Sequence, residues 1–200
     1  MALCLLGALS ACGSGSEHTG PGTAPATTTP AGPSFDCATA GSEAEKLVCN
    51  DPGLAALDRR LADEYDKALN RPGADKAMLQ GAQHGWATGR DDCAQAGDVS
   101  RCVRESYQTR IFELRTSDPA VPAPPVVTYS CPGDKAFTAR FYHEFDPRVA
   151  VLTWGEDSAV TFGEPAASGA KYGRDGIDFW EHHGEVKVNF FGNEFTCHTT

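Results

Sequence analysis

The period of the hydrophobic residues changes once along this chain, at the proline-rich stretch 116–125. Before it, apolar residues recur at the spacing of an amphipathic helix, as at Leu54, Leu57, Leu61, Tyr65 and Leu69. After it, Val186, Val188 and Phe190 alternate with Glu185, Lys187 and Asn189. This order predicts an α+β protein in two domains. A small helical bundle over 35–115 is followed, after a stiff linker, by a small antiparallel β-barrel over 126–200.

Local signals divide the helical region into four helices. Ser42-x-x-Glu45 is a capping box before a short helix, and Asp51-Pro52 supplies an N-cap and a proline for the next one. A third helix is expected over roughly 75–92 with an inner stripe of Met78, Ala82 and Trp86. A fourth begins near Val99, with a stripe of Val99, Val103, Tyr107, Ile111 and Leu114. We interpret Trp86 and Tyr107 as core residues of the bundle.

Beyond the linker, short aromatic and β-branched runs separated by glycine turns predict seven strands. They span residues 126–131, 136–143, 148–154, 158–163, 176–181, 185–191 and 194–198. Seven or eight short strands at this spacing favour a meander that closes into a barrel, which removes exposed sheet edges. The stretch Ala167–Tyr172 falls between two of the runs and is predicted to be a loop.

The cysteines are divided evenly between the parts of the chain. Two precede residue 35, four lie in the helical region, and Cys131 and Cys197 bracket the β region. Because no C-x-x-C pair is present, disulfides within each domain are favoured over zinc. A Cys131–Cys197 bond would join the start of the barrel to its end and stabilise it by roughly 4 kcal/mol. The helical cysteines allow three pairings, and proximity along the chain favours Cys37 with Cys49 and Cys93 with Cys102.

The first 34 residues are expected to serve export and tethering. The apolar run 1–11 ends in Leu9-Ser10-Ala11-Cys12, which resembles the lipobox of bacterial lipoproteins. That resemblance implies cleavage before Cys12 and lipid, such as palmitate, on the new terminus. Because the run is too short to span a bilayer, the acyl chains would anchor the protein. Residues 12–34 are expected to be a disordered tether, and the protein an exported lipoprotein on the outer face of a bacterial membrane.

Two kinds of chemistry are open to the loop and its surroundings besides recognition. Ser168-Gly169-Ala170-Lys171 has the form S-x-x-K, the nucleophile motif of penicillin-recognising serine enzymes, but their S-D-N and K-T-G elements are absent. A serine hydrolase is therefore an alternative that rests on four residues. A metal site would have to use His143, His182, His183 and His198, with Glu181. Since no H-E-x-x-H or comparable spacing occurs, we expect no metal and no cofactor.

Two sets of residues resemble families of lysozyme inhibitors. The helical set resembles the amino-terminal domain of LprI-type lysozyme-inhibitor lipoproteins: Cys37, Cys49, Leu57-Asp58, Tyr65, Trp86, Arg90-Asp91-x-Cys93, Cys102 and Tyr107-x-x-Arg110-Ile111-x-x-Leu114. The β set resembles the MliC/PliC inhibitors of c-type lysozyme: Tyr129-x-Cys131, Phe141-Tyr142, Ser168-Gly169-x-x-Tyr172, Phe179-Trp180, Gly184-Glu185 and Cys197. Together they cover nearly all of residues 35–200.

The resemblance implies that the loop enters the cleft of a c-type lysozyme and thereby protects peptidoglycan, as in host–pathogen encounters. Ser168 would contact the catalytic carboxyl groups, Gly169 would allow close approach, and Tyr172 would be a second contact. The family also uses a lysine in a W-x-K-G-like segment. Here Trp180-Glu181-His182-His183-Gly184 has none, so His182 or His183 when protonated, or Lys171, is expected to replace it.

The charge of the chain fits this expectation. The net charge is −10, and residues 126–200 contribute −5 because eleven acidic residues face six basic ones. Acidic domains disfavour nucleic acid as a partner and would attract a basic protein. The sequence thus predicts a protein inhibitor rather than an enzyme, whose helical domain assists the barrel. An S-x-x-K hydrolase and an envelope-binding adhesion lipoprotein are the alternatives.

Overall fold

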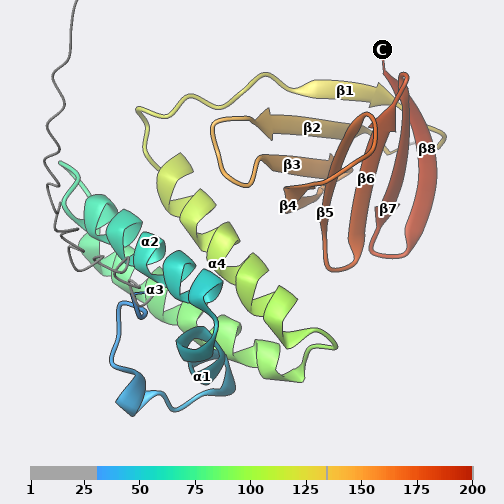
Figure 1. The fold of residues 1–200 in the computed structure, drawn as a ribbon. Helices are drawn as coiled ribbons and strands as arrows, with labels where there is room; N and C mark the ends of the chain where they lie inside the picture. The colour runs from blue at the N-terminus through green and yellow to red at the C-terminus, as the bar shows by residue number, and fades with distance from the viewer. Residues whose placement is uncertain (1–30, 134, 200) are drawn as a thin grey trace, which may run out of the picture.

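The helices and strands follow one another in the predicted order (Figure 1). The computed structural model describes residues 31–133 and 135–199, so the expectations for Cys12 and most of the tether lie outside it. The helices are α1 (Glu43–Asn50), α2 (Pro52–Leu69), α3 (Lys76–Asp91) and α4 (Val99–Thr116). The strands are β1 (Val127–Ser130), β2 (Phe137–Tyr142), β3 (Val149–Trp154), β4 (Asp157–Glu164), β5 (Ala170–Arg174), β6 (Ile177–His182), β7 (Glu185–Phe190) and β8 (Asn193–Thr199). The predicted fold class, helices followed by an antiparallel barrel, is confirmed.

The capping hydrogen bonds expected at the predicted starts of α1 and α2 are present. At α1, the Ser42 hydroxyl accepts from the Glu45 amide at 3.1 Å, and the Glu45 carboxylate accepts from the Ser42 amide at 3.2 Å. At α2, the Asp51 carboxylate accepts from the amides of Gly53 and Leu54, with Pro52 as the first helical residue. These contacts satisfy amides that have no partner within the helix.

The predicted inner face of α3 was correct for Trp86, which packs against the helical core, and wrong for the other two residues. Met78 is 67% exposed, and Ala82 is exposed as well. The inner stripe consists of Leu79, Gln83, Trp86 and Arg90. Two of these four residues are polar, so the apolar pattern alone pointed to the wrong side of the helix.

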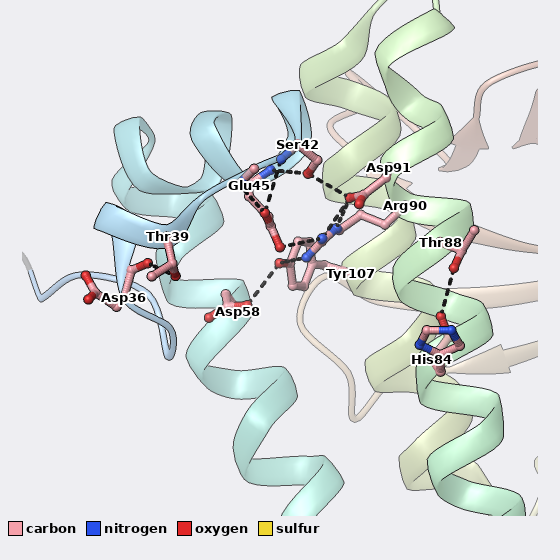
Figure 2. A network of polar contacts seen from close by, with 11 residues as sticks. Asp36, Thr39, Ser42, Glu45, Asp58, His84, Thr88, Arg90, Asp91 and Tyr107 are labelled. Carbon is pink, nitrogen blue, oxygen red and sulfur yellow. Dashed lines mark hydrogen bonds and ion pairs between the residues drawn. The ribbon is translucent and has the colours of Figure 1, made fainter.

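The helical core encloses a polar network centred on Arg90 (Figure 2). Its guanidinium donates to the Asp91 carboxylate at 2.7 and 3.0 Å and to the Tyr107 hydroxyl at 3.1 Å. Tyr107 in turn donates to Asp58 on α2 at 2.9 Å, and Glu45 on α1 accepts from Arg90 at 3.5 Å. Burial lowers the pKa of Arg90, but the bonds to Asp91 and Tyr107 outweigh it and raise the pKa overall. The network therefore joins all four helices around one buried cation.

The strands form a closed barrel in the order β1 to β8. Each strand pairs antiparallel with the next, and β1 pairs with β8 through Tyr129 with Thr199 and Ser130 with His198. Inward-facing residues of every strand make one core, with Phe137, Phe179 and Leu152 fully buried. The structure thus adds one strand, β5, that the sequence pattern did not predict.

Among the described residues, three disulfides connect cysteines that are close in the fold. Cys37 bonds to Cys49 and Cys93 to Cys102, the pairs that proximity along the chain favoured. Cys131, just after β1, bonds to Cys197 in β8 and so joins the two ends of the barrel. Within the described residues, no helix is long and apolar enough to cross a membrane.

The helical region packs against the barrel through α4, which lies on the side of the helices that faces the strands (Figure 1). Phe112 of α4 inserts among barrel residues and contacts Tyr142 and Phe145 edge-on or tilted, with ring centroids 4.8 and 5.2 Å apart. Polar contacts flank this cluster. The Arg60 guanidinium donates to the Asp146 carbonyl at 2.8 Å, and the Asp175 amide donates to Glu105 at 3.1 Å.

Candidate functional site

The loop that the sequence singled out connects β4 to β5 and is shorter than predicted. It spans residues 165–169, because Ala170 already pairs with Glu181 of β6. Ser168 is exposed, and among the residues that the structure describes none hydrogen bonds to its hydroxyl. A hydroxyl in this position is free to donate to a partner and to accept from it.

Gly169 fixes the path of this loop. Its φ of +73° lies in the left-handed region, and a Cβ there would collide with the Glu181 carbonyl oxygen. The loop backbone therefore lies directly on the end of β6, an approach that only glycine permits. The sequence predicted that Gly169 allows close approach to a partner, whereas in the structure it allows close approach to the barrel itself.

Trp180 holds the loop from the neighbouring strand. Its indole N–H donates to the Ser168 carbonyl oxygen at 3.2 Å, and its ring is 39% exposed. The ring stacks on His182, with centroids 5.6 Å apart. Sequence reasoning gave Trp180 no role of its own. The signal available in the sequence was strand alternation, which places Trp180 on the outward face of β6 when its neighbour Phe179 faces the core.

The two histidines lie at the same end of the barrel as the loop. His182 ends β6, and its Cα is among the backbone atoms nearest to Gly169. His183 and Gly184 form the two-residue turn to β7, both with positive φ, as the right-handed twist of a hairpin favours. His183 is exposed, and its ring centroid is 4.0 Å from that of His182. The structure therefore brings Ser168, Gly169, His182 and His183 together on one rim.

Lys171 belongs to β5 rather than to the loop, and it is already paired. Its ammonium lies 2.7 Å from Glu164, the last residue of β4, and 3.9 Å from Asp178 of β6. The hydrogen bond and the charge of Glu164 raise the pKa of Lys171. A cation held in this way stabilises the base of the loop and is a weaker candidate for the family's lysine than the histidines are.

Tyr172, expected to be an exposed contact, is buried. It is only 2% exposed and packs between Phe141 and Phe179, with ring centroids 5.3 and 6.1 Å away. Burial raises the pKa of its hydroxyl. The reason is strand phase, since Tyr172 faces the same side of the sheet as Phe179, its partner across β5 and β6. Its role is to fill the core beneath the loop, and its ring is not available as a contact surface.

The two alternative chemistries each require a particular arrangement of side chains around the loop. In the described part of the chain no base accepts a hydrogen bond from the Ser168 hydroxyl, and the Lys171 ammonium pairs with Glu164 and Asp178. Within residues 31–133 and 135–199, no group of three or more histidine, cysteine, aspartate or glutamate side chains could hold a metal ion. The arrangement instead suits recognition by an exposed hydroxyl on a fixed loop.

Comparison with known proteins matches both parts of the chain. Residues 36–114 match the family model "Lysozyme inhibitor LprI", and residues 129–195 match "Membrane-bound lysozyme-inhibitor of c-type lysozyme". Lipoprotein LprI from Mycobacterium bovis and Lipoprotein LprI from Mycobacterium tuberculosis are each 47% identical over 176 residues. The alignments cover 87% of this chain and 88% of either relative. No solved structure is significantly similar.

Proposed function

We propose that this chain, which belongs to the LprI family of lysozyme inhibitors, blocks c-type lysozyme by placing Ser168 in the active-site cleft of the enzyme. The observation that carries the proposal is the exposed Ser168 hydroxyl, which has no partner among residues 31–133 and 135–199, on a loop fixed by Gly169 and Trp180. A loop already held in its binding shape loses little conformational entropy on association. The family itself supports the coarser statement, that the protein is an inhibitor of lysozyme rather than an enzyme.

The active site of lysozyme suits an inhibitor that inserts a hydroxyl group between its catalytic carboxyl groups. We call Ser168 in this inserted position the Ser168 plug. A retaining glycosidase holds two carboxyl groups about 5 Å apart, one protonated and one ionised. The Ser168 hydroxyl would accept from the first and donate to the second, while the loop excludes the sugar chain. The acidity of the barrel, −5 over residues 126–200, would attract a basic enzyme.

The histidine turn would supply a second contact beside the loop. His183 is exposed on the same rim, and a protonated imidazole can donate to acidic or carbonyl groups of the enzyme. We propose it, with His182 behind it, in place of the lysine that the related inhibitors use. If His183→Gln inhibits as strongly as the wild type at both ends of the range pH 5 to 8, this assignment is wrong.

Replacing Ser168 by alanine should weaken inhibition about ten- to a hundredfold, the value of a hydrogen bond to a charged group. The measurement is the inhibition constant against hen-type lysozyme on bacterial cell walls, with direct binding as a check. Ser158→Ala is the matched control, because this exposed serine lies near the β3–β4 turn at the other end of the barrel. Equal inhibition by the wild type and Ser168→Ala would contradict the plug. Ester or β-lactam turnover that depends on Ser168 would instead establish the hydrolase.

We infer that the helical domain, residues 35–115, supports the barrel domain, residues 126–200, across the linker 116–125. The support reaches the base of the loop through Glu164, whose carboxylate lies between Lys171 at 2.7 Å and Arg101 of α4 at 3.7 Å. The same carboxylate covers Gly173, where a Cβ would collide with it. The helical domain thereby holds the strand from which the loop departs.

Removing the Arg101 charge should therefore weaken inhibition, by up to about fivefold because the ion pair is partly exposed. We expect Arg101→Gln to show this loss in the whole mature protein, by inhibition constant. Arg104→Gln is a close control, since Arg104 is three residues further along α4 and pairs with Asp51, inside the helical region. If both variants inhibit equally, the helical domain does not act through Glu164.

Anchoring is proposed from the sequence and the relatives together. Both relatives are named as lipoproteins, and Leu9-Ser10-Ala11-Cys12 has the lipobox form. We propose residues 1–11 as the export signal and Cys12 as the lipidated residue. Residues 12–34 would tether the protein to the outer face of the membrane. Retention of Cys12→Ala in the membrane fraction would contradict this anchor.

A further inference from the structure

The outward face of β5–β8 is a regular array of polar side chains around one tryptophan. The strand registers place Lys171, Trp180, Lys187 and Thr196 in one row across the four strands. The next row holds Gly173, Asp178, Asn189 and Glu194. Because neighbours in a row are directly opposite on adjacent strands, their side chains converge on one surface.

A groove of about 590 Å³ runs over these rows. We call it the sheet groove, and it is lined by Lys171, Asp178, Trp180, Lys187, Val188, Asn189, Glu194, Phe195 and Thr196. Its volume is in the range of sites for small ligands. Trp180 and Lys187 also line a second hollow of about 290 Å³ beside the histidine turn. Trp180 is 39% exposed, so part of its indole remains an apolar surface between His182, which stacks on the ring, and the Lys187 ammonium, which lies 5.8 Å from the ring centroid.

The charges of the sheet groove select against ionic ligands. Two lysines face two acidic residues, so the lining is neutral overall. The cations are already paired, Lys171 with Glu164 at 2.7 Å and Lys187 with Glu185 at 3.6 Å. An anion would therefore find no unpaired lysine, and a fully apolar ligand would leave carboxylate and amide groups without partners.

We propose that the sheet groove binds a neutral oligosaccharide. A sugar ring has an apolar C–H face that fits against an indole and a rim of hydroxyls that both donate and accept. The Trp180 ring would contact the apolar face of the sugar. The side chains of Asp178, Glu194 and Thr196 would bind the hydroxyl groups of the sugar. Glu194 and Thr196 are exposed and have no side-chain partner within the described residues. This site shares Trp180 with the Ser168 loop, whereas Glu194 and Thr196 lie on β8 and do not contact the loop.

The test uses the whole mature protein and two soluble probes, the β-1,4-linked tetramers of N-acetylglucosamine and of glucose. Ligand-observed saturation-transfer NMR and calorimetry should detect binding of at least one of them. We expect Trp180→Ala to weaken that binding about tenfold or more, and Glu194→Gln and Asp178→Asn to weaken it measurably. Asp157→Asn makes the same change on an exposed strand end away from the sheet groove, and should leave binding unaltered.

Three results would overturn the proposal. The first is the absence of binding of either tetramer to the wild type at millimolar concentration. The second is binding that Trp180→Ala and Glu194→Gln leave unchanged. Weaker lysozyme inhibition in Glu194→Gln without any saccharide binding would also count against it, because the sheet groove would then be part of the enzyme contact. Since Glu194 does not touch the loop, failure of the Ser168 plug and failure of this site are separable.

Discussion

Gly169→Ala is expected to weaken inhibition of c-type lysozyme about tenfold to a hundredfold while the barrel stays folded. The added Cβ meets the Glu181 carbonyl, and the φ of +73° is unfavourable for alanine. The loop must then move off the end of β6, which breaks the hydrogen bond from Trp180 to the Ser168 carbonyl. Because the binding shape becomes a minor population, the apparent affinity falls by the same fraction.

A second glycine separates the collision from the backbone strain. Gly155 also has a positive φ, of +64°, but a Cβ there would meet only the Lys135 side chain at 3.5 Å. Gly155→Ala should therefore lose some stability and keep its inhibition constant. Circular dichroism would verify both folds. If the two variants inhibit equally, the shape of the loop is not what Gly169 contributes, and the preorganised plug is wrong.

Local signals in the sequence were sufficient for most element boundaries. The capping box at Ser42, the Asp51 N-cap and the Pro52 start depend on residues within one turn, so neighbouring sequence determines them. The barrel was predictable for a similar reason, since glycine turns set the strand lengths and a meander pairs each strand with the next. Closure and the Cys131–Cys197 bond then followed from strand number and cysteine position.

The faces of two elements were less predictable, because tertiary contacts decide them. The inner face of α3 includes the half-buried Gln83 and the buried Arg90, which turn inward because other helices supply Arg110, Tyr107 and Glu45 as partners. In α4, Phe112 points away from the helical core and packs against the outer face of the barrel. No pattern within a single helix reveals that it has two apolar neighbours.

Prediction of the candidate site was limited by tertiary contacts in the same way. Ser168, Gly169 and the histidine turn were found from a motif and do lie on one rim. Tyr172 was assigned the wrong side because β5 was not predicted, since Ala170–Arg174 contains a glycine and no β-branched residue. Once that segment is a strand, alternation places Tyr172 inward and Lys171 outward. The hydrogen bond from Trp180 to the loop depends on which strands are neighbours in the sheet. The spacing of residues along the sequence could not predict it.

The buried network around Arg90 predicts the largest loss of stability in the helical domain. Arg90 is 6% exposed, and it is the cation of a cluster that also holds Asp58, Asp91 and Glu45. Arg90→Met keeps the volume and removes the charge. Because this leaves the buried Tyr107 hydroxyl and the partly exposed carboxylates of Asp91 and Glu45 without their shared donor, the expected cost is about 1–3 kcal/mol. Urea unfolding followed by the helical circular dichroism signal would measure it.

Arg90→Lys distinguishes charge from geometry. Lysine keeps the positive charge, but it lacks the planar fork that reaches both Asp91 and Tyr107. We therefore expect a loss between those of the wild type and Arg90→Met. If lysine is as good as arginine, the network requires only a charge.

Asp58 offers the sharper test, because it belongs to α2 and reaches Arg90 only through the Tyr107 hydroxyl. Asp58→Asn removes the buried anion and keeps one oxygen that can accept from Tyr107. If the two charges stabilise each other across this bridge, the double variant Arg90→Met with Asp58→Asn should lose less than the sum of the single losses. The expected difference is about 1 kcal/mol or more. Strict additivity would mean that Asp58 and Arg90 act independently, so that the four helices are not joined through one network.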